Sequence, residues 1–333
     1  MDYSDLTSKL IDGNTRAAAR LITTVENDIE AAEKIINSIY PYTGKAYIIG
    51  ITGAPGTGKS TFISTLTKSY VDLGKKVGII CVDPTSPLTG GALLGDRIRM
   101  KQHFSLNNVF IRSMANRGQL GGLARATEDV IKILDVYGCE IIIIETVGVG
   151  QSEVDIFRSA QTVVVLVVPG LGDDIQAIKA GIMEITDIFV VNKMDLAGAD
   201  KKVAEIMQML EYKKNYKYES EAFSAKFAKI DQWTPEITKV NSKTGENFEE
   251  LLKIINKHKN FLQESGVIDN YLKNRIKSET IEILKHKLTK KAEELINSDD
   301  KIEEFIEKAI KKSIDPYALA GEILKLFFEK RDN

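Results

Sequence analysis

The clearest chemical signal in the sequence is a glycine-rich run that follows the apolar stretch Tyr47 to Thr52 and precedes a helical pattern. The run fits the pattern GxxxxGK followed by Ser or Thr, in the order of strand, loop and helix that a phosphate-binding loop requires. In such a loop backbone N–H groups converge on phosphate oxygens, Lys59 reaches the β and γ phosphates, and Ser60 offers its hydroxyl to Mg²⁺. The run consists of Gly53, Ala54, Pro55, Gly56, Thr57, Gly58, Lys59, Ser60 and Thr61. The sequence therefore predicts a nucleotide site that includes Mg²⁺.

An acidic residue at the end of another apolar run is the candidate that completes the metal site. The isoleucines Ile141 to Ile144 are followed by Glu145, and Gly148 comes shortly after. We expect Glu145 to lie beside the metal and Gly148 near the γ-phosphate. An ordinary acid at a strand end is the alternative interpretation of Glu145.

A third motif predicts which base is bound. The apolar run Ile188 to Val191 continues into Asn192, Lys193 and, after one residue, Asp195. In such Asn-Lys-x-Asp sites the aspartate accepts hydrogen bonds from guanine N1–H and its 2-amino group, while the lysine packs along the ring. Adenine would leave the carboxylate unpaired, and hydrogen bonds to charged groups are worth ~1.5 to 3 kcal/mol each. We therefore expect guanine.

A further segment of the site, called the fifth element below, is expected further along the chain. Asn241, Ser242 and Lys243 follow a short apolar run and precede Thr244 and Gly245. We expect this segment to contact the base through backbone N–H groups, with a plain loop as the alternative.

These motifs need a scaffold of alternating strands and helices. Strands separated by helical patterns imply right-handed crossovers and a mainly parallel sheet covered on both faces. The seven expected strands are Tyr47 to Thr52, Val77 to Val82, Val109 to Arg112, Glu140 to Glu145, Thr162 to Val168, Ile188 to Val191 and Ile237 to Val240. We predict an α/β fold with a P-loop NTPase sheet over 44–265, preceded by a helical segment over 1–43 and followed by a helical arm over 266–333.

The composition bounds the class of protein. The chain has 333 residues, of which 43% are hydrophobic and 28% charged, which is typical of a folded globular protein. The formal net charge of -2 gives no general attraction to nucleic acid or to an anionic membrane, so we expect neither partner. Cys81 and Cys139 lie in apolar runs outside any CxxC pattern, and the start MDYSDLTSKL lacks an apolar signal region. We expect a reducing, cytoplasmic setting.

Several longer stretches together resemble one family. They are Thr23 to Asn27, Asp83 to Met100, Arg112 to Leu123, Glu145 to Glu153, Pro169 to Lys179 and Asp315 to Ala320. With the phosphate and base motifs they are similar to the MeaB/ArgK family of P-loop GTPases, which is associated with methylmalonyl-CoA mutase and its relatives. The resemblance covers nearly the whole chain.

The resemblance implies a function and a set of roles. It implies a homodimeric GTPase that uses GTP and Mg²⁺, protects an adenosylcobalamin-dependent acyl-CoA mutase and gates the loading of its cofactor. It implies that Lys59 and Ser60 act on phosphate and Mg²⁺, and that Asp83, Asp96 and Glu145 surround the metal and the attacking water. Whether Asp83 or Asp96 binds the metal directly or through water stays open.

Two departures from the family pattern and a set of switch residues accompany the resemblance. Lys243 follows Ser242 where the family usually reads Ser-Ala, and Gly172-Asp173-Asp174 stands where it usually reads Gly-Asp-Glu. The candidates for switch or partner contacts are Arg97, Arg99, Arg117, Gln151, Asp173, Asp174, Gln176 and Lys179. Each arginine could complete the site as a cation or be a surface or structural residue. The loop Pro169 to Lys179 is the candidate that relays contact with the client.

Two other classes share the phosphate-site logic. A metal-insertion GTPase of the nickel type would need His-rich tracts or Cys pairs, which this sequence lacks. A kinase of transport proteins would need a protein-substrate motif, and we find none.

Apolar stripes from Leu272 to Leu288 and from Phe305 to Phe328 predict that the helical arm pairs with that of a second subunit.

Overall fold

Seven parallel strands form the centre of the molecule, in a computed structural model that describes residues 2–83, 108–115, 122–146, 159–170, 185–216, 233–298 and 300–329. The strand order is β3-β2-β4-β1-β5-β6-β7, and every neighbouring pair is parallel. The strands are β1 (Tyr47–Gly53), β2 (Val77–Asp83), β3 (Val109–Ala115), β4 (Ile141–Thr146), β5 (Thr162–Val167), β6 (Ile188–Asn192) and β7 (Glu236–Val240). All seven expected strands and the α/β class are therefore confirmed.

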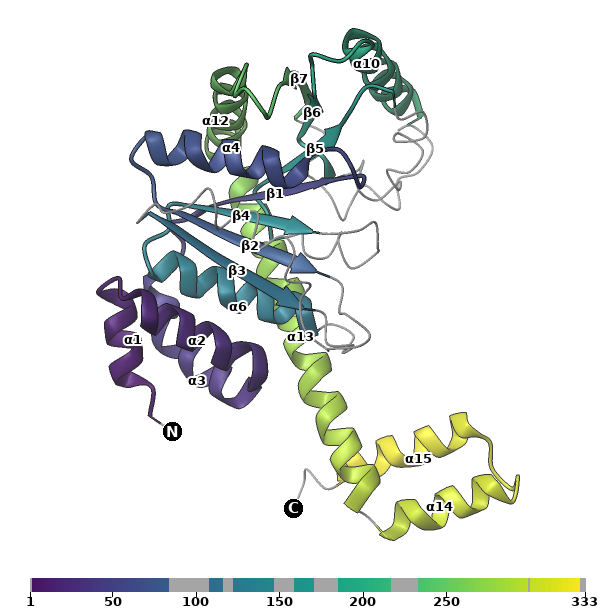
Figure 1. Cartoon of the computed structure of the whole chain (residues 1–333). Helices are drawn as coiled ribbons and strands as arrows, with labels where there is room; N and C mark the ends of the chain where they lie inside the picture. The colour runs from purple at the N-terminus through teal and green to yellow at the C-terminus, as the bar shows by residue number, and fades with distance from the viewer. Residues whose placement is uncertain are drawn as a thin grey trace. The chain divides into compact units, whose positions relative to one another are not determined.

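Helices cover both faces of this sheet (Figure 1). On one face, α4 (Lys59–Asp72) and α12 (Phe248–Glu264) bury Phe62 and Phe248 in one apolar cluster with residues of the sheet, and the two ring centroids are 5.4 Å apart. On the other face, α6 (Gly122–Val136) and α10 (Ala199–Tyr216) bury their apolar sides. Strands with near-continuous Val and Ile fit this arrangement, because a parallel sheet is buried on both sides.

The N-terminal helices form a further layer outside α6. They are α1 (Ser4–Ile11), α2 (Thr15–Asn27) and α3 (Ile29–Ile39), followed by the short 3-10 turn η1 (Tyr40–Tyr42). The starts of α2 and α3 are set by capping side chains, since Asn14 accepts from the N–H of Ala17 at 3.0 Å and Asp28 from that of Ala31 at 2.9 Å. The helical lead-in expected from the sequence is present.

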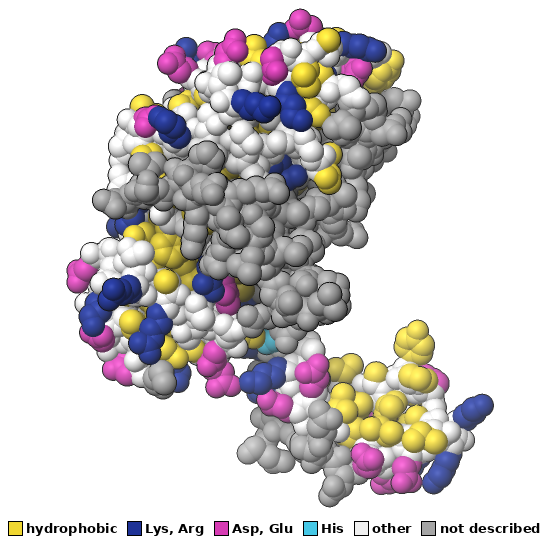
Figure 2. Space-filling view, in the orientation of Figure 1, with side chains coloured by type: hydrophobic (Ala, Val, Ile, Leu, Met, Phe, Trp, Pro, Cys, Tyr) yellow, Lys and Arg dark blue, Asp and Glu magenta, His cyan; other side chains and the backbone are white. Residues whose placement is uncertain are grey.

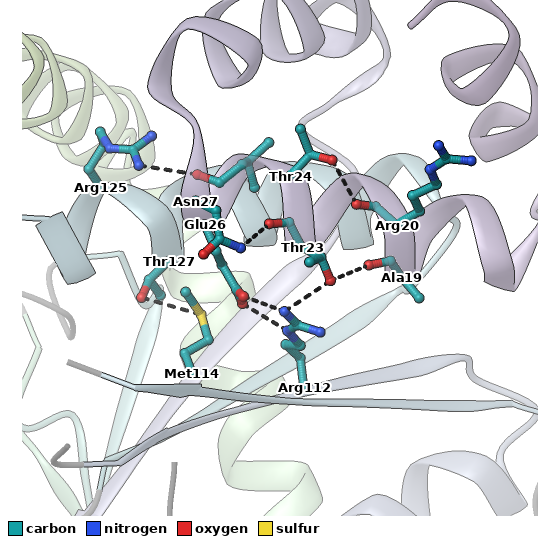
Figure 3. Close-up of polar contacts among 11 residues, drawn as sticks. Ala19, Arg20, Thr23, Thr24, Glu26, Asn27, Arg112, Met114, Arg125 and Thr127 are labelled. Atoms are coloured by element: carbon teal, nitrogen blue, oxygen red, sulfur yellow. Dashed lines mark hydrogen bonds and ion pairs between the residues drawn. The ribbon is translucent and has the colours of Figure 1, made fainter. Parts of the chain in front are cut away.

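Polar contacts fasten α2 to the sheet edge and to α6 (Figure 3). Arg112 of β3 donates from Nε to Oε1 of Glu26 at 2.8 Å, its Nη2 contacts the second oxygen of Glu26, and the same Nη2 reaches Thr23 Oγ1 at 3.3 Å. Arg125 of α6 donates to the carbonyl of Val25 at 3.2 Å. The stretch Thr23 to Asn27, noted in the sequence as part of the family resemblance, thus holds the end of α2 against both β3 and α6.

The chain divides into two compact units, Met1–Ile276 and Lys277–Asn333. The second unit contains the distal part of α13 (Val267–Ser298), then α14 (Asp300–Ile310) and α15 (Pro316–Glu329). Within it α14 and α15 pack on each other, Ile302 is buried, and a group of apolar side chains is exposed (Figure 2). In the described ranges, no helix has both the length and the apolar composition needed to cross a membrane.

Candidate functional site

The phosphate-loop motif lies between the end of β1 and the start of α4, as its sequence predicted. Gly53 and Gly58 have positive φ angles of 156° and 87°. A Cβ atom at Gly53 would lie 2.5 Å from the carbonyl oxygen of Leu166, and one at Gly58 would lie 2.9 Å from Asn192 Nδ2. Only glycine fits at these two positions, because both the backbone angle and the available space exclude a side chain.

The ammonium group of Lys59 contacts the backbone of this loop. Its Nζ donates to the carbonyl oxygen of Gly53 at 2.7 Å and approaches that of Ala54 at 3.4 Å. Thr57 closes the turn, since its hydroxyl donates to the Ala54 carbonyl at 2.8 Å. The positive charge of Lys59 and the N-terminus of α4 therefore both lie at the phosphate loop. A lysine beside a helix N-terminus is an arrangement that binds phosphate.

The strand ends that carry Glu145 and Asp83, two candidate metal residues, lie at the same edge of the sheet as the phosphate loop. In the strand register Glu145 pairs with Ile51 of β1 and with Cys81 of β2. Its side chain is 1% exposed, and the thiol of Cys81 lies 3.9 Å from its Oε2. Asp83 ends β2 two residues after Cys81. Carboxylate and hydroxyl oxygens are ligands that Mg²⁺ prefers, so Glu145, with the hydroxyl of Ser60 on α4, fits that ion chemically.

Asn192 joins the phosphate loop to the base motif. It is the last residue of β6, and its Nδ2 donates to the carbonyl oxygen of Thr57 at 2.8 Å. Its Oδ1 accepts from both the N–H and the hydroxyl of Ser242, at 3.2 and 2.7 Å. Lys193 follows with a φ angle of 57° and donates from Nζ to the Gly56 carbonyl at 2.9 Å. A left-handed non-glycine residue costs ~1 kcal/mol or more, so this network holds Lys193 in a strained position.

Asp195, the residue expected to bind the base, is oriented by an amide. Asn241 donates from Nδ2 to Oδ1 of Asp195 at 3.0 Å, and its own Oδ1 accepts from the N–H of Lys243 at 3.0 Å. The N–H groups of Ser242 and Lys243 thus bond to the side chains of Asn192 and Asn241. Direct contact of the fifth element with the base stays a prediction; its described bonds position two residues of the base motif.

The structure brings together the phosphate loop, Glu145, the base motif and the fifth element, and it places the end of β2 at Asp83 on the same edge. The remaining candidates lie outside the described residues: Asp96, Arg97, Arg99, Arg117, Gly148, Gln151, Asp173, Asp174, Gln176 and Lys179. One polar residue of the site was not expected from the sequence. Thr65, in the middle of α4, donates to the Ser242 carbonyl at 2.7 Å, and a threonine inside a helical pattern carries no signal for such a bond.

The fold and the site define a class of protein: an α/β P-loop GTPase with the phosphate loop after β1 and an Asn-Lys-x-Asp motif after β6. The family model described as methylmalonyl-CoA mutase-associated GTPase MeaB matches residues 18–297, and the chain belongs to this family.

Two relatives and one solved structure show how far the similarity extends. A Pyrococcus horikoshii protein whose name assigns it to the GTPases is 50% identical over 321 residues, covering 96% of this chain and 97% of its own. The GTPase ArgK of Escherichia coli is 34% identical over 262 residues, covering 78% and 76%. A crystal structure titled LAO/AO transport system kinase superposes with a TM-score of 0.65 at 21% identity, covers 97% of both chains, and shows the shared fold.

Proposed function

We propose that this protein binds guanine nucleotides and hydrolyses GTP with Mg²⁺, and that it acts as a chaperone of an adenosylcobalamin-dependent acyl-CoA mutase in the cytoplasm. The observation that carries the nucleotide part is the pair of hydrogen bonds that the Asn192 side chain makes with Thr57 and Ser242. These bonds connect the phosphate loop to the fifth element through the base motif. The family description supports the client, since it names a methylmalonyl-CoA mutase-associated GTPase.

In this proposal the residues of the candidate site have separate parts in binding. Lys59 exchanges its carbonyl partners for the β and γ phosphates, and Ser60 and Glu145 face Mg²⁺, which neutralises charge on the phosphates. Asp195 accepts from guanine, while the aliphatic part of Lys193 covers the ring. Asp83 and Asp96 are proposed to complete the surroundings of the metal and the attacking water.

Slow turnover without the client also belongs to the proposal. G proteins whose site is incomplete hydrolyse GTP at ~10⁻⁴ s⁻¹, and completing the charge or ordering the water adds ~10³ to 10⁵. Binding of the mutase would supply that completion, with the loop Pro169 to Lys179 as the proposed relay. Protection of the mutase and gating of its cofactor loading would follow from this coupling.

A homodimer formed through the helical arm is the remaining part of the proposal. Ile281, Leu284 and Leu288 recur at helical spacing on α13 and are half exposed. The second unit also exposes apolar side chains of α14 and α15 (Figure 2). A two-fold partner that presents the same face would cover them.

Single-turnover hydrolysis of GTP, with and without purified mutase, tests the proposal. We expect slow basal turnover, acceleration by the mutase, and loss of both in Lys59→Ala. A wild-type protein that binds ATP as tightly as GTP would contradict the guanine assignment. Turnover that no acyl-CoA mutase changes would contradict the chaperone role. Nickel-binding and protein-phosphotransfer measurements on the same sample address the metal-insertion and kinase alternatives.

A further inference from the structure

The hydroxyl of Thr65 lies between two elements that bind different parts of a nucleotide. Thr65 is in the second turn of α4, the helix that begins at Lys59, and its Oγ1 donates to the carbonyl oxygen of Ser242 at 2.7 Å. Ser242 is buried in the loop between β7 and α12. The bond therefore spans from the phosphate-binding helix to the fifth element.

This bond is not the default choice for a threonine in a helix. Oγ1 of Thr65 also lies 3.1 Å from the carbonyl of Thr61, one turn earlier, which is the usual local partner of such a hydroxyl. A hydroxyl has one proton, and the shorter distance is to Ser242. The carbonyl of Ser242 gains a partner in a buried place, where an unpaired acceptor would be costly.

The Thr65 bond closes a ring of contacts around the site. Ser242 donates to Asn192, Asn192 donates to Thr57 of the phosphate loop, and the phosphate loop continues into α4, which carries Thr65. Without the Thr65 bond, the described hydrogen bonds that the fifth element makes through side chains of the site are those to Asn192 and Asp195 of the base motif. Asn192 would then lose part of the support for its side chain.

We propose that Thr65 is a positioning residue for guanine: its hydroxyl holds the Ser242 loop, and through it Asn192, at a fixed place relative to the phosphate loop. This inference rests on the proposed binding of guanine nucleotides. Thr65 contacts no part of the nucleotide in this role. Because the loop that it holds supports Asn192 and, through Asn241, Asp195, we expect its effect to fall mainly on base recognition.

The test compares Thr65→Val, which keeps the shape and removes the hydroxyl, with Thr65→Ser, which keeps the hydroxyl. Thr67→Val is the matched control, because Thr67 lies on the same helix and its buried hydroxyl has no hydrogen-bond partner among the described residues. Dissociation of fluorescently labelled GDP and ADP is measured by stopped flow for each variant. We expect GDP to leave Thr65→Val roughly tenfold faster, the size of one lost hydrogen bond. ADP should leave at an unchanged rate, and Thr65→Ser and Thr67→Val should behave like the wild type.

Two results would overturn the inference. One is an unchanged GDP rate in Thr65→Val. The other is an equal acceleration of GDP and ADP, which would mean a general structural role. A wild type that does not prefer GDP to ADP would instead refute the proposed function, so the two failures are distinguishable.

Discussion

Arg275 donates two hydrogen bonds, from Nε at 3.1 Å and from Nη2 at 2.6 Å, to the same oxygen of Glu128. The other oxygen of Glu128 accepts from the hydroxyl of Ser159. Arg275 is on α13, next to the last residue of the first compact unit, and Glu128 is buried on α6. This pair therefore fastens the first turns of α13 to α6.

The first prediction concerns the stability that this pair provides. Glu128→Gln removes the carboxylate charge that faces Arg275 in a largely buried place, which should lower the free energy of unfolding by about 3 kcal/mol. Urea unfolding followed by circular dichroism measures the effect. Glu250→Gln is the control, because Glu250 and Lys253 form an exposed pair on α12 and exposed pairs contribute under ~1 kcal/mol. Equal effects of the two substitutions would show that the Arg275–Glu128 pair contributes no more to the free energy of unfolding than an exposed pair.

The second prediction is the pH dependence of the same contribution. Burial alone would raise the pKa of Glu128, but Arg275, Lys132 and Ser159 outweigh it and hold that pKa below its ordinary value of 4.5. A carboxyl group with a lowered folded-state pKa stabilises the fold above its unfolded-state pKa and loses this contribution as the pH falls. The difference in stability between wild type and Glu128→Gln should therefore be constant at neutral pH and shrink below pH 4.5. Unfolding curves across that range measure it, and a gap that widens in acid would contradict the assignment.

The third prediction concerns base selectivity. Asp195→Asn replaces an acceptor oxygen by a donor, so binding should shift from guanine toward xanthine nucleotides, whose 2-position carries an oxygen. Asn241 donates to Oδ1 of Asp195, so it should turn the new amide with its oxygen toward Asn241 and its NH₂ group away. We expect the shift to be smaller in the double variant with Asn241→Ala. Competition titrations with GDP and XDP measure both, and equal shifts would show that Asn241 does not orient the residue.

The fourth prediction concerns the arm. Light scattering of the whole chain should give ~74 kDa, twice the 37.0 kDa chain mass. Leu284→Glu with Leu288→Glu places charge on the exposed apolar stripe and should give the monomer mass. Lys290→Glu, on the opposite side of α13, should leave the mass unchanged.

Point variants test the arm better than truncation at Gly266. Such a truncation would also remove Arg275 and its two hydrogen bonds to Glu128. A dimer that survives both leucine substitutions would show that this stripe is not the contact.

The sequence by itself determined the sheet and predicted the local motifs of the candidate site. The seven strands are evident because buried parallel strands read as continuous Val and Ile runs, and the phosphate and base motifs have fixed local spacing. The strand end at Glu145 predicted a metal carboxylate, whereas the role of Asp83 came from the family resemblance. The strand order that puts both strand ends beside each other came from the folded sheet. The inferences of the strands and motifs need only local pattern.

Tertiary structure decided which distant side chains support the site and join the elements. The bond from Thr65 to Ser242 connects residues 177 positions apart, and that from Arg275 to Glu128 spans 147. Neither Thr65 nor Arg275 has a distinctive local pattern in the sequence, because a threonine in a helix and an arginine on a helix surface are both common. Their roles depend on how α4 packs against the β7 loop and how α13 packs against α6, and side-chain contacts of that range are fixed only when the chain is folded.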